Sequence, residues 1–231
     1  MRFGLIASSG GAVFKAVKQI LDECSFQQHQ FYVIVDRQCP IYDYCISNDI
    51  EAELIIEPDN ARFSQRAFEL FSHQGDVAVV CLFFSRLVTE SLFSNILTVN
   101  FHPSLLPHYK GFRAIEQAIS DDYPQLGVTL HVVDESIDGG QILAQLATAI
   151  TAQMKEHPAK AHTASYVQKV YLMLVLIDKL EGLEISVGKE KLAQLLLLKF
   201  NQPQVIPPYQ LRQAYYEQVL RIQSVENLEI I

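Results

Sequence analysis

Short apolar runs alternate with longer segments of mixed polarity along the first half of the chain. Runs of this kind, rich in β-branched and aromatic residues, predict buried strands, and the segments between them have the spacing of helices. The predicted strands cover Arg2 to Ala7, Phe31 to Val35, Glu53 to Ile56, Val77 to Phe83 and Ile96 to Phe101. Strands that alternate with helices are typical of βαβ units. We therefore expect an α/β fold with a doubly wound, mostly parallel sheet.

The pattern changes after Pro124, where two strand-like runs follow each other without a helix between them. The runs from Leu126 to Val133 and from Gln141 to Thr148 are separated by a turn that contains Asp-Gly-Gly. Parallel neighbours need a crossover connection, and this turn is too short to supply one. These two strands are therefore expected to pair as an antiparallel extension of the sheet.

The last third of the chain is predicted to be helical. Apolar residues recur at helical spacing from Pro158 to Leu180 and predict a long amphipathic helix packed on the sheet. The stretch from Lys191 to Lys199 includes the run LLLLK, which is too short to span a membrane. The chain then has three prolines, Pro203, Pro207 and Pro208, which predict an extended link. A final amphipathic helix is expected from Gln210 to Ile222. The chain is thus divided into a main domain, residues 1–185, and a short C-terminal extension with a helical tail, residues 186–231.

Polar side chains with catalytic potential lie where one predicted strand ends. In the run ILTVNFH, Asn100 and His102 are two residues apart, so their side chains share one face of the strand. Pro103 and Pro107 cannot donate ladder hydrogen bonds, which predicts that the strand ends at His102 and leads into a stiff loop. Both side chains would then lie at the carboxyl edge of the sheet, where open α/β sheets bind ligands. Asp138 follows in the turn DESIDGG.

This trio of residue types suits the transfer of an acyl group. An Asn amide can donate a hydrogen bond to the oxygen of an attacked carbonyl, and a neighbouring His can donate as imidazolium or relay a proton. A nearby carboxylate is expected to raise the pKa of the His and to orient its ring. An acceptor amine can attack the carbonyl directly, so no Ser, Cys or Lys nucleophile is needed. The alternative is a buried strand end at which Asn and His only cap a loop.

A longer set of residues resembles the formyltransferase family in identity and spacing. The set comprises Asn100, His102, Pro103, Ser104, Leu105, Leu106, Pro107, Tyr109 and Gly111, followed by Gly127 to His131, Asp138 to Gly140 and Gln145. The resemblance spans residues 1–185 and marks them as a catalytic domain with a fold of the formyltransferase type. It implies that Asn100, His102 and Asp138 are catalytic. It also implies that 10-formyltetrahydrofolate is the formyl donor. The acyl-transfer chemistry described above needs no metal.

The same resemblance assigns two segments to the folate donor. One is the end of the run FFSRLV, with the residues Arg86, Leu87 and Val88. It is similar to a segment of the family that contacts the pteridine mainly through its backbone. The other is similar to the family's loop that lies against the pteridine, with the residues Glu135, Ser136 and Ile137. His131 precedes this loop and could assist the site. A structural role, in which His131 is buried and hydrogen-bonds a neighbour, explains this residue equally well. We therefore assign no catalytic role to His131.

The acceptor side departs from one branch of the family. Ser8-Ser9-Gly10-Gly11 precedes a helix that begins near Ala12, a position where backbone N–H groups can hold an anion. The loop lacks the G-x-G-x-x-G spacing of a dinucleotide site. The glycinamide ribonucleotide branch has Ser or Thr and then Asn where this chain has Ala12 and Val13. That branch also has a Glu shortly after a Val-Gln pair, where this chain continues with Lys169, Val170 and Tyr171.

Because two acceptor contacts of that branch are missing, the preferred acceptor is another small-molecule amine, an amino sugar on a nucleotide. Glycinamide ribonucleotide is the alternative acceptor, and hydrolysis of the donor is a less favoured reaction. A non-catalytic folate- or nucleotide-binding module is the alternative from another functional class. Residues that are candidates for acceptor binding are Gly10, Gly11, His108, Tyr109 and Lys110. The alternative for His108, Tyr109 and Lys110 is that they lie in a solvent-exposed loop and bind no acceptor.

Charge and cysteine content narrow the partners and the compartment. A net charge of −8 and a pI near 5.3 provide no broad basic surface, which argues against a nucleic-acid partner such as tRNA. The four cysteines show no paired metal spacing, and no secretory signal precedes the first strand. We therefore expect reduced thiols, a cytoplasmic protein and no membrane partner. The oligomeric state is left open, with a homodimer as one alternative.

Overall fold

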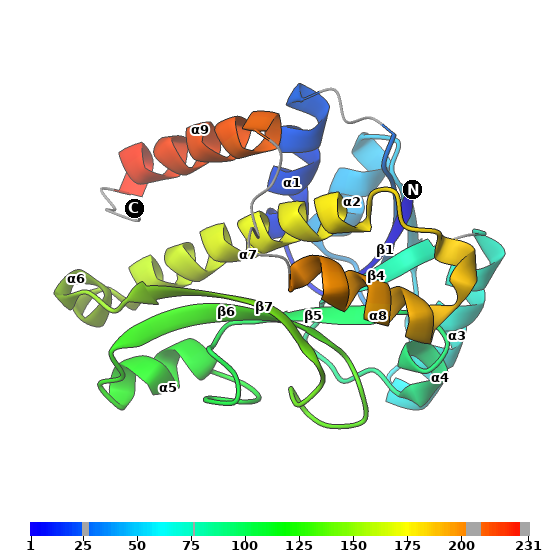
Figure 1. Ribbon diagram of the computed structural model, residues 1–231, viewed down its shortest axis with the longest axis horizontal. Helices are drawn as coiled ribbons and strands as arrows, with labels where there is room; N and C mark the ends of the chain where they lie inside the picture. The colour runs from blue at the N-terminus through cyan, green and yellow to red at the C-terminus, as the bar shows by residue number, and fades with distance from the viewer. Residues whose placement is uncertain (25–27, 76, 202–208, 227–231) are drawn as a thin grey trace.

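A seven-stranded sheet lies at the centre of the computed structural model, which describes residues 1–24, 28–75, 77–201 and 209–226 (Figure 1). The strands are β1 (Arg2–Ala7), β2 (Gln30–Val35), β3 (Glu51–Leu54), β4 (Val77–Phe83), β5 (Thr98–His102), β6 (Gln125–Val132) and β7 (Ile142–Ala149). Their order across the sheet is β3-β2-β1-β4-β5-β6-β7. The strands β1 to β5 pair in parallel, whereas β6 pairs antiparallel with both β5 and β7. The predicted antiparallel extension is therefore confirmed.

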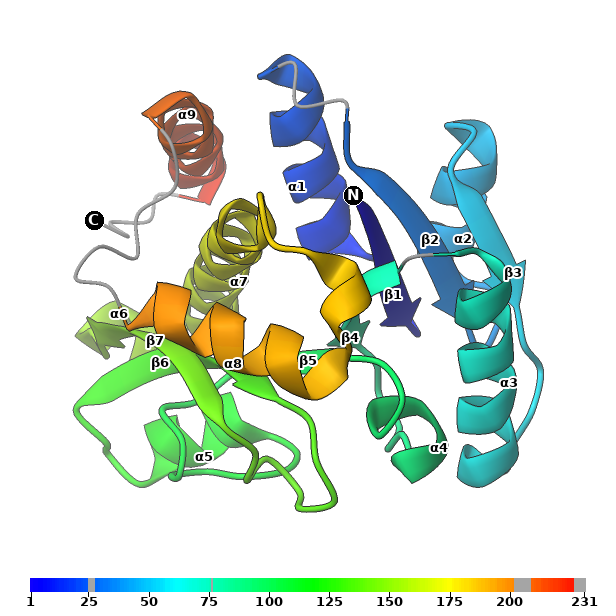
Figure 2. The same cartoon turned by 45° about the vertical axis from the view of Figure 1, so that its right-hand side comes forward.

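Helices cover both faces of the sheet (Figure 2). They are α1 (Ala12–Glu23), α2 (Pro40–Ser47), α3 (Asn60–His73), α4 (Glu90–Phe93), α5 (Ala114–Ser120), α6 (Ala152–Glu156), α7 (Pro158–Leu180), α8 (Lys189–Phe200) and α9 (Tyr209–Glu226), with a 3₁₀ turn at Ile185–Val187. The helices α1 and α7 pack together on one face, and α3 and α4 pack on the other (Figure 2). This arrangement confirms the predicted doubly wound α/β fold.

Successive side chains of β1 point to opposite faces of the sheet and enter two different cores. Phe3 and Leu5 are fully buried in the core formed with α1 and α7. Ile6 lies instead in the core that contains Phe63 and Phe71 of α3. Because both faces of the sheet are covered by helices, the central strands have continuous apolar sequences. These apolar sequences made it possible to predict the positions of the strands.

The predicted boundaries hold in the middle of the sheet and shift at its edge. The elements β1, β4 and α7 begin and end at the predicted residues. The edge strand β3 covers Glu51–Leu54 rather than Glu53 to Ile56, because its pairing with β2 begins at Glu51. Ile56 is 78% exposed and does not belong to a buried run. The predicted link with Pro203, Pro207 and Pro208 lies outside the described residues.

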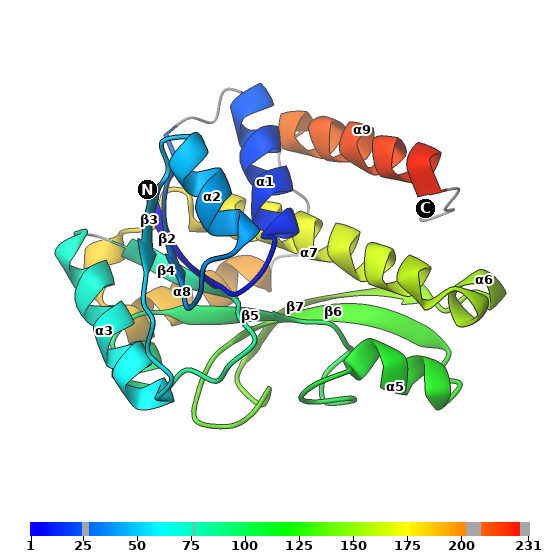
Figure 3. The ribbon, with the colours of Figure 1, turned by 180° about the vertical axis from the view of Figure 1, so that it is seen from behind.

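The C-terminal helices share the hydrophobic core of the α1 and α7 face. Leu192, Leu196 and Phe200 of α8 are buried there, as are Tyr215 and Val219 of α9. Helix α9 lies beside α1 (Figure 3). The division of the chain at residue 185 remains a prediction, and residues on both sides of it contribute to one core. None of the described helices is apolar over a length that would cross a membrane.

Candidate active site

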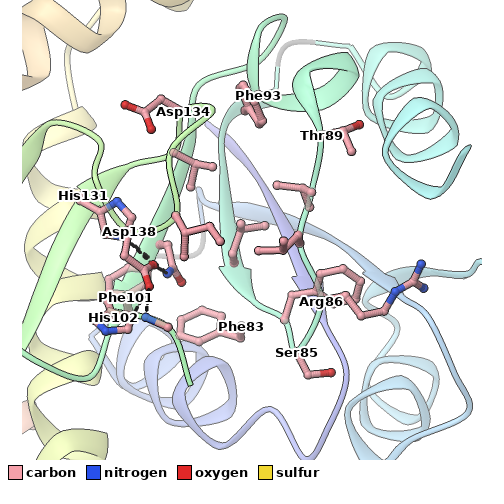
Figure 4. Close-up of a pocket in the computed structure, with 18 of the residues that line it drawn as sticks. Phe83, Ser85, Arg86, Thr89, Phe93, Phe101, His102, His131, Asp134 and Asp138 are labelled. Carbon is pink, nitrogen blue, oxygen red and sulfur yellow. Dashed lines mark hydrogen bonds and ion pairs between the residues drawn. The ribbon is translucent and has the colours of Figure 1, made fainter. Parts of the chain in front are cut away.

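A large cavity opens at the carboxyl edge of the sheet, where the strand order changes direction. Because β2 and β4 lie on opposite sides of β1, the loops that follow β1 and β4 diverge and leave a crevice between them. The cavity there has a volume of about 1560 Å³. It is lined by residues of these two loops, of β5 and of the β6–β7 loop (Figure 4). The site therefore occupies the position at which α/β sheets of this type bind ligands.

Asn100, His102 and Asp138 meet in this cavity. The first two lie on β5, and the loop between β6 and β7 brings Asp138 over them. The Nδ2 atom of Asn100 is 3.4 Å from Oδ1 of Asp138, and Nδ1 of His102 is 3.2 Å from Oδ2. Asp138 has a φ of 47°, in the left-handed region that non-glycine residues seldom adopt. The backbone N–H of Gly111 donates to its Oδ2 atom at 2.8 Å and helps to fix the carboxylate.

Both ring nitrogens of His102 face hydrogen-bond acceptors. Nδ1 faces the Asp138 carboxylate, and Nε2 is 2.7 Å from the backbone carbonyl oxygen of Tyr109. A neutral imidazole has one N–H and can serve one of these acceptors, whereas an imidazolium serves both. Burial nevertheless lowers the pKa of His102, and the Tyr109 carbonyl and the charge of Asp138 oppose this only in part. The Asp138 carboxylate thus raises the pKa of His102, as expected, but desolvation outweighs this attraction and the net shift is downward.

His131 is a fourth side chain in this cluster, although the sequence analysis gave it no catalytic role. The antiparallel pairing of β5 and β6 places it directly opposite Asn100. Its Nδ1 atom is 3.0 Å from the carbonyl oxygen of Val132, and its Nε2 atom is 3.4 Å from Nδ2 of Asn100 and 3.5 Å from Oδ1 of Asp138. The ring is 2% exposed, so it acts on its neighbours without contact with bulk water.

The surroundings of Asp138 keep it ionised. Burial acts to raise the pKa of this carboxyl group, but hydrogen bonds from His131 and Gly111 and the charge of His102 together hold it below the usual value. Asp138 is thus a carboxylate at neutral pH. A fixed negative charge beside a buried His can stabilise a proton that the ring takes up during a reaction.

Comparisons with known proteins agree with this geometry. Residues 1–175 match the family described as Formyl transferase. The chain belongs to the formyl transferase family. It is 28% identical over 156 residues to the phosphoribosylglycinamide formyltransferase of Bacillus subtilis, a match that covers 64% of this chain and 80% of that protein. It is 35% identical over 107 residues to the methionyl-tRNA formyltransferase of Lysinibacillus sphaericus, which covers 46% of this chain and 34% of that protein.

A solved formyl transferase has the same fold. The phosphoribosylglycinamide formyltransferase from Bacillus halodurans superposes with a TM-score of 0.61 and 26% identity, over 79% of this chain and 100% of that chain. The matched segment spans about a third of the length of the methionyl-tRNA formyltransferases. These matches confirm the predicted family and its α/β fold.

The two segments assigned to the folate donor of a formyl transferase both line the cavity, at residues 86–88 and 135–137. The side chain of Arg86 points away from the catalytic cluster (Figure 4). Its guanidinium donates to the backbone carbonyl oxygens of Glu57 and Pro58, each at 2.8 Å. This segment is therefore placed to meet a ligand through its backbone, as the resemblance implied, and its contact with folate remains a prediction.

Three large apolar side chains are exposed along the cavity. Leu87 is 51% exposed, Phe112 is 74% exposed and Ile137 is 57% exposed. They come from three different loops, after β4, after β5 and after β6. Apolar side chains that gather in the open around one cavity mark a surface that a ligand covers. These three residues form the apolar rim of the cavity.

The residues assigned to the acceptor fall into two groups. Gly11 lines the cavity, and no larger residue fits there: its φ is 64°, and an added Cβ would lie 2.4 Å from the Cδ1 atom of Ile41. Among the described residues, the lining of the cavity does not include Gly10, His108, Tyr109 or Lys110.

The ring of Tyr123 explains the orientation of two of these side chains. Its centroid is 5.3 Å from that of His108 and 5.5 Å from that of Tyr109, so the three rings pack together. Tyr109 contributes its backbone carbonyl to the site through His102. The acceptor-binding roles of His108, Tyr109 and Lys110 remain predictions, and the geometry gives them no direct support.

Lys169 of α7 lines the cavity without a role that the sequence analysis assigned. Burial lowers the pKa of its ammonium group from 10.5 to about 8. Tyr171, which follows the Val-Gln pair in the stretch where the glycinamide ribonucleotide branch has a Glu, packs on Tyr215 of α9 with ring centroids 5.1 Å apart. Within the described ranges, no three His, Cys, Asp or Glu side chains gather in a way that would hold a metal ion.

Proposed function

We propose that this protein transfers the formyl group of 10-formyltetrahydrofolate to the amine of a small molecule. The observation that carries this proposal is the contact of Asn100 and His102 with the ionised Asp138 inside a cavity of about 1560 Å³. Membership of the formyl transferase family gives the reaction class. The cluster supplies a hydrogen-bond donor, a proton carrier and a fixed negative charge, which are the groups that acyl transfer to an amine requires.

In the proposed reaction, the acceptor nitrogen attacks the formyl carbon, and an electron pair of the C=O bond moves to oxygen. Asn100 donates a hydrogen bond to the oxyanion. The acceptor nitrogen then loses a proton and the N10 atom of the folate gains one. The bond between N10 and the formyl carbon breaks as the C=O bond forms again. The products are the N-formyl compound and tetrahydrofolate.

The surroundings of His102 suit a ring that exchanges a proton during this reaction. Burial lowers its pKa, which favours release of a proton. The Tyr109 carbonyl at 2.7 Å and the Asp138 carboxylate at 3.2 Å stabilise the charged form. A proton carrier works best when its two forms are close in energy near the working pH. We infer that His102 takes a proton from the acceptor amine and passes it towards N10.

The donor is proposed to lie between residues 86–88 and residues 135–137. The apolar rim of Leu87, Phe112 and Ile137 offers apolar surface to the aromatic rings of the folate. Backbone N–H and C=O groups of the same loops are then available for the polar edge of the pteridine. This division between apolar faces and a few polar contacts is typical of small-molecule sites.

We propose an amino sugar on a nucleotide as the acceptor. Ala12 and Val13 line the cavity at the start of α1 and offer neither a hydroxyl nor an amide to a bound phosphate. The net charge of −8 argues against tRNA. Glycinamide ribonucleotide remains the second candidate, because the matched Bacillus subtilis and Bacillus halodurans proteins are phosphoribosylglycinamide formyltransferases.

A mass-spectrometric screen tests the reaction and the acceptor together. The protein and 10-formyltetrahydrofolate are incubated with a panel of amines, and products are sought that are heavier by about 28 dalton, the mass of formyl in place of hydrogen. Formylation of amino-sugar nucleotides supports the proposal, and formylation of glycinamide ribonucleotide alone selects the second candidate. Donor consumption without an amine indicates hydrolysis. Folate binding without any turnover indicates a binding module and overturns the proposal.

A further inference from the structure

Lys169 lies at the junction of two cavities. It lines the large cavity with the catalytic cluster and also a smaller cavity of about 340 Å³. Val13, Pro103 and Arg113 line both cavities as well. The smaller cavity is therefore a side pocket that adjoins the reaction centre, and a molecule in the large cavity can extend a group into it.

One face of α7 forms a wall of this side pocket. His162, Ser165, Tyr166 and Lys169 line it, and their spacing of three, four and seven residues places them on the same side of a helix. His162 is engaged by Glu116, with 3.1 Å between Nε2 and Oε1. Two further polar groups on this face, the hydroxyl of Ser165 and the ammonium of Lys169, have a different environment.

Ser165 and Lys169 are polar groups without protein partners. The Oγ atom of Ser165 is buried and makes no hydrogen bond, and the whole residue is 3% exposed. Within the part of the chain that the structure describes, Lys169 makes no hydrogen bond or ion pair, and burial lowers its pKa to about 8. Buried polar groups such as the Ser165 hydroxyl are normally paired, and a partly buried ammonium without a partner is unfavourable. A ligand that brings acceptor oxygens and negative charge would satisfy both groups.

Nearby acidic groups do not supply that charge. Glu116 lines the side pocket but contacts His162. Asp138 lines the large cavity and contacts His102 and Gly111. Arg113 adds a second cationic residue to the lining that the two cavities share. Glu116 and His162 engage each other in the lining of the side pocket, and its other polar residues are Arg113, Ser165, Tyr166 and Lys169.

We propose that this side pocket is an anion subsite for the formyl acceptor, in which Lys169 and Ser165 hold a compact anionic group of the amine substrate. This inference rests on the proposed function and narrows its substrate class to amines that carry a carboxylate or a phosphate. A volume of about 340 Å³ is near the lower end of small-molecule sites, so it suits one such group with its nearest atoms. The amine then lies between the subsite and the catalytic cluster.

Anion binding can be measured without any turnover. Nuclear magnetic resonance of protein labelled with ¹³C at the lysine Cε atoms follows Lys169, whose signal is assigned by its loss in Lys169→Met. The probes are inorganic phosphate and acetate, added separately. Either anion should shift the Lys169 signal saturably and raise its pKa, because the bound charge stabilises the ammonium. The anion that binds more tightly identifies the group that the subsite prefers.

Variants separate a built subsite from general attraction to lysine. Ser165→Ala removes one hydrogen-bond donor, so we expect anion affinity to fall about threefold to tenfold. Lys169→Met should abolish the saturable binding. Lys191→Met changes an exposed lysine of α8 and is expected to leave the affinity unchanged. All three variants should have the circular dichroism spectrum of the wild type, which shows that they are folded.

The two proposals fail in different ways. If neither anion shifts the Lys169 signal saturably up to about 100 mM, the subsite is rejected, since weaker binding has no role in substrate selection. An equal response of exposed lysines such as Lys191 also rejects it. If the anions bind at Lys169 but a non-reactive folate analogue does not bind at all, the subsite stands as a binding site and the proposed formyl transfer fails.

Discussion

His102 and Asp138 are held 3.2 Å apart by backbone groups on their far sides as well as by their mutual attraction. The carbonyl of Tyr109 faces the far side of the imidazole, and the N–H of Gly111 holds the carboxylate. Both backbone groups come from the loop that follows β5. The pair is therefore positioned before a substrate binds, which is the condition under which electrostatic stabilisation is most effective.

The charge of Asp138 is the first target for a test. Asp138→Asn retains the size of the side chain and an oxygen that can accept from Gly111, but it removes the charge that stabilises protonated His102. Turnover should fall by about 10³-fold to 10⁴-fold with little change in folding, as for other carboxylates that support a catalytic His. Single-turnover rates and circular dichroism provide the measurements. Asp122→Asn, which changes an exposed carboxylate, is the control, and equal rates for the two variants would reject the mechanism.

The apolar rim should contribute to the affinity for the donor. Leu87→Ser and Ile137→Ser each remove apolar surface that the folate rings would cover, and a half-buried aliphatic side chain is worth about 1 kcal/mol. Each variant should weaken the binding of a folate analogue about fivefold, measured by calorimetry. Ile56→Ser is the matched control, because Ile56 is 78% exposed and is absent from the described lining of the cavity. Unchanged affinity in both rim variants would place the donor elsewhere.

Lys169 should lower the stability of the fold at neutral pH. Because its pKa falls from 10.5 to about 8 on folding, the charged form is disfavoured in the native state. Lys169→Met should raise the free energy of unfolding at pH 7 by about 3 kcal/mol, since each unit of that fall in pKa corresponds to about 1.4 kcal/mol. From pH 8 to pH 10.5, the unfolded chain binds more protons at this residue than the native protein does, so wild type gains stability as pH rises. Below pH 8 this dependence disappears.

Urea unfolding of both proteins across this pH range measures the effect of Lys169. The difference between wild type and Lys169→Met should shrink as pH rises, because the tyrosines and cysteines that titrate in the same range are common to both proteins. A difference that stays constant with pH would show that Lys169 has an ordinary pKa. A wild type that is the more stable protein at pH 7 would contradict the prediction.

The start of α1 should select against glycinamide ribonucleotide. Ala12 and Val13 leave a phosphate with backbone N–H groups, whereas Ser and Asn side chains would add hydrogen bonds worth about 0.5–1.5 kcal/mol each. The double variant Ala12→Ser, Val13→Asn should raise kcat/KM for this acceptor about tenfold. Steady-state assays of both proteins measure the change. If wild type already reaches about 10⁴ M⁻¹s⁻¹ with glycinamide ribonucleotide, the inference from these two residues is wrong.

Strand β5 shows how much of the site the sequence could predict. Side chains two residues apart on a strand share a face, so Asn100 and His102 were expected together, and the structure brings them together. The position of Asp138 is different, because no periodicity describes the path of a loop. Its assignment depended on the resemblance to the formyltransferase family, as did the two segments that line the cavity.

His131 and Lys169 show what the sequence could not predict. The sequence predicted an antiparallel extension of the sheet but not the register between β5 and β6. His131 lies opposite Asn100 because of that register, and a shift of one residue would separate the two side chains. Helix α7 is buried around most of its circumference, so its pattern does not single out the face that meets the cavity. Tertiary packing sets the rotation of α7 about its axis and thereby places Lys169 in the lining of the cavity.

The backbone contacts to the catalytic side chains affect how relatives of this protein should be compared. The carbonyl groups of Tyr109 and Val132 are present whatever side chains occupy those positions, and the N–H of Gly111 is one that every residue except proline supplies. What these contacts require is a fixed number of residues between His102 and Gly111. The length of that interval is therefore a more reliable criterion for a functional homologue than the identity of the residues inside it. A sequence with few matching letters but an unchanged interval can retain the site, whereas a close relative with one inserted residue there would lose it.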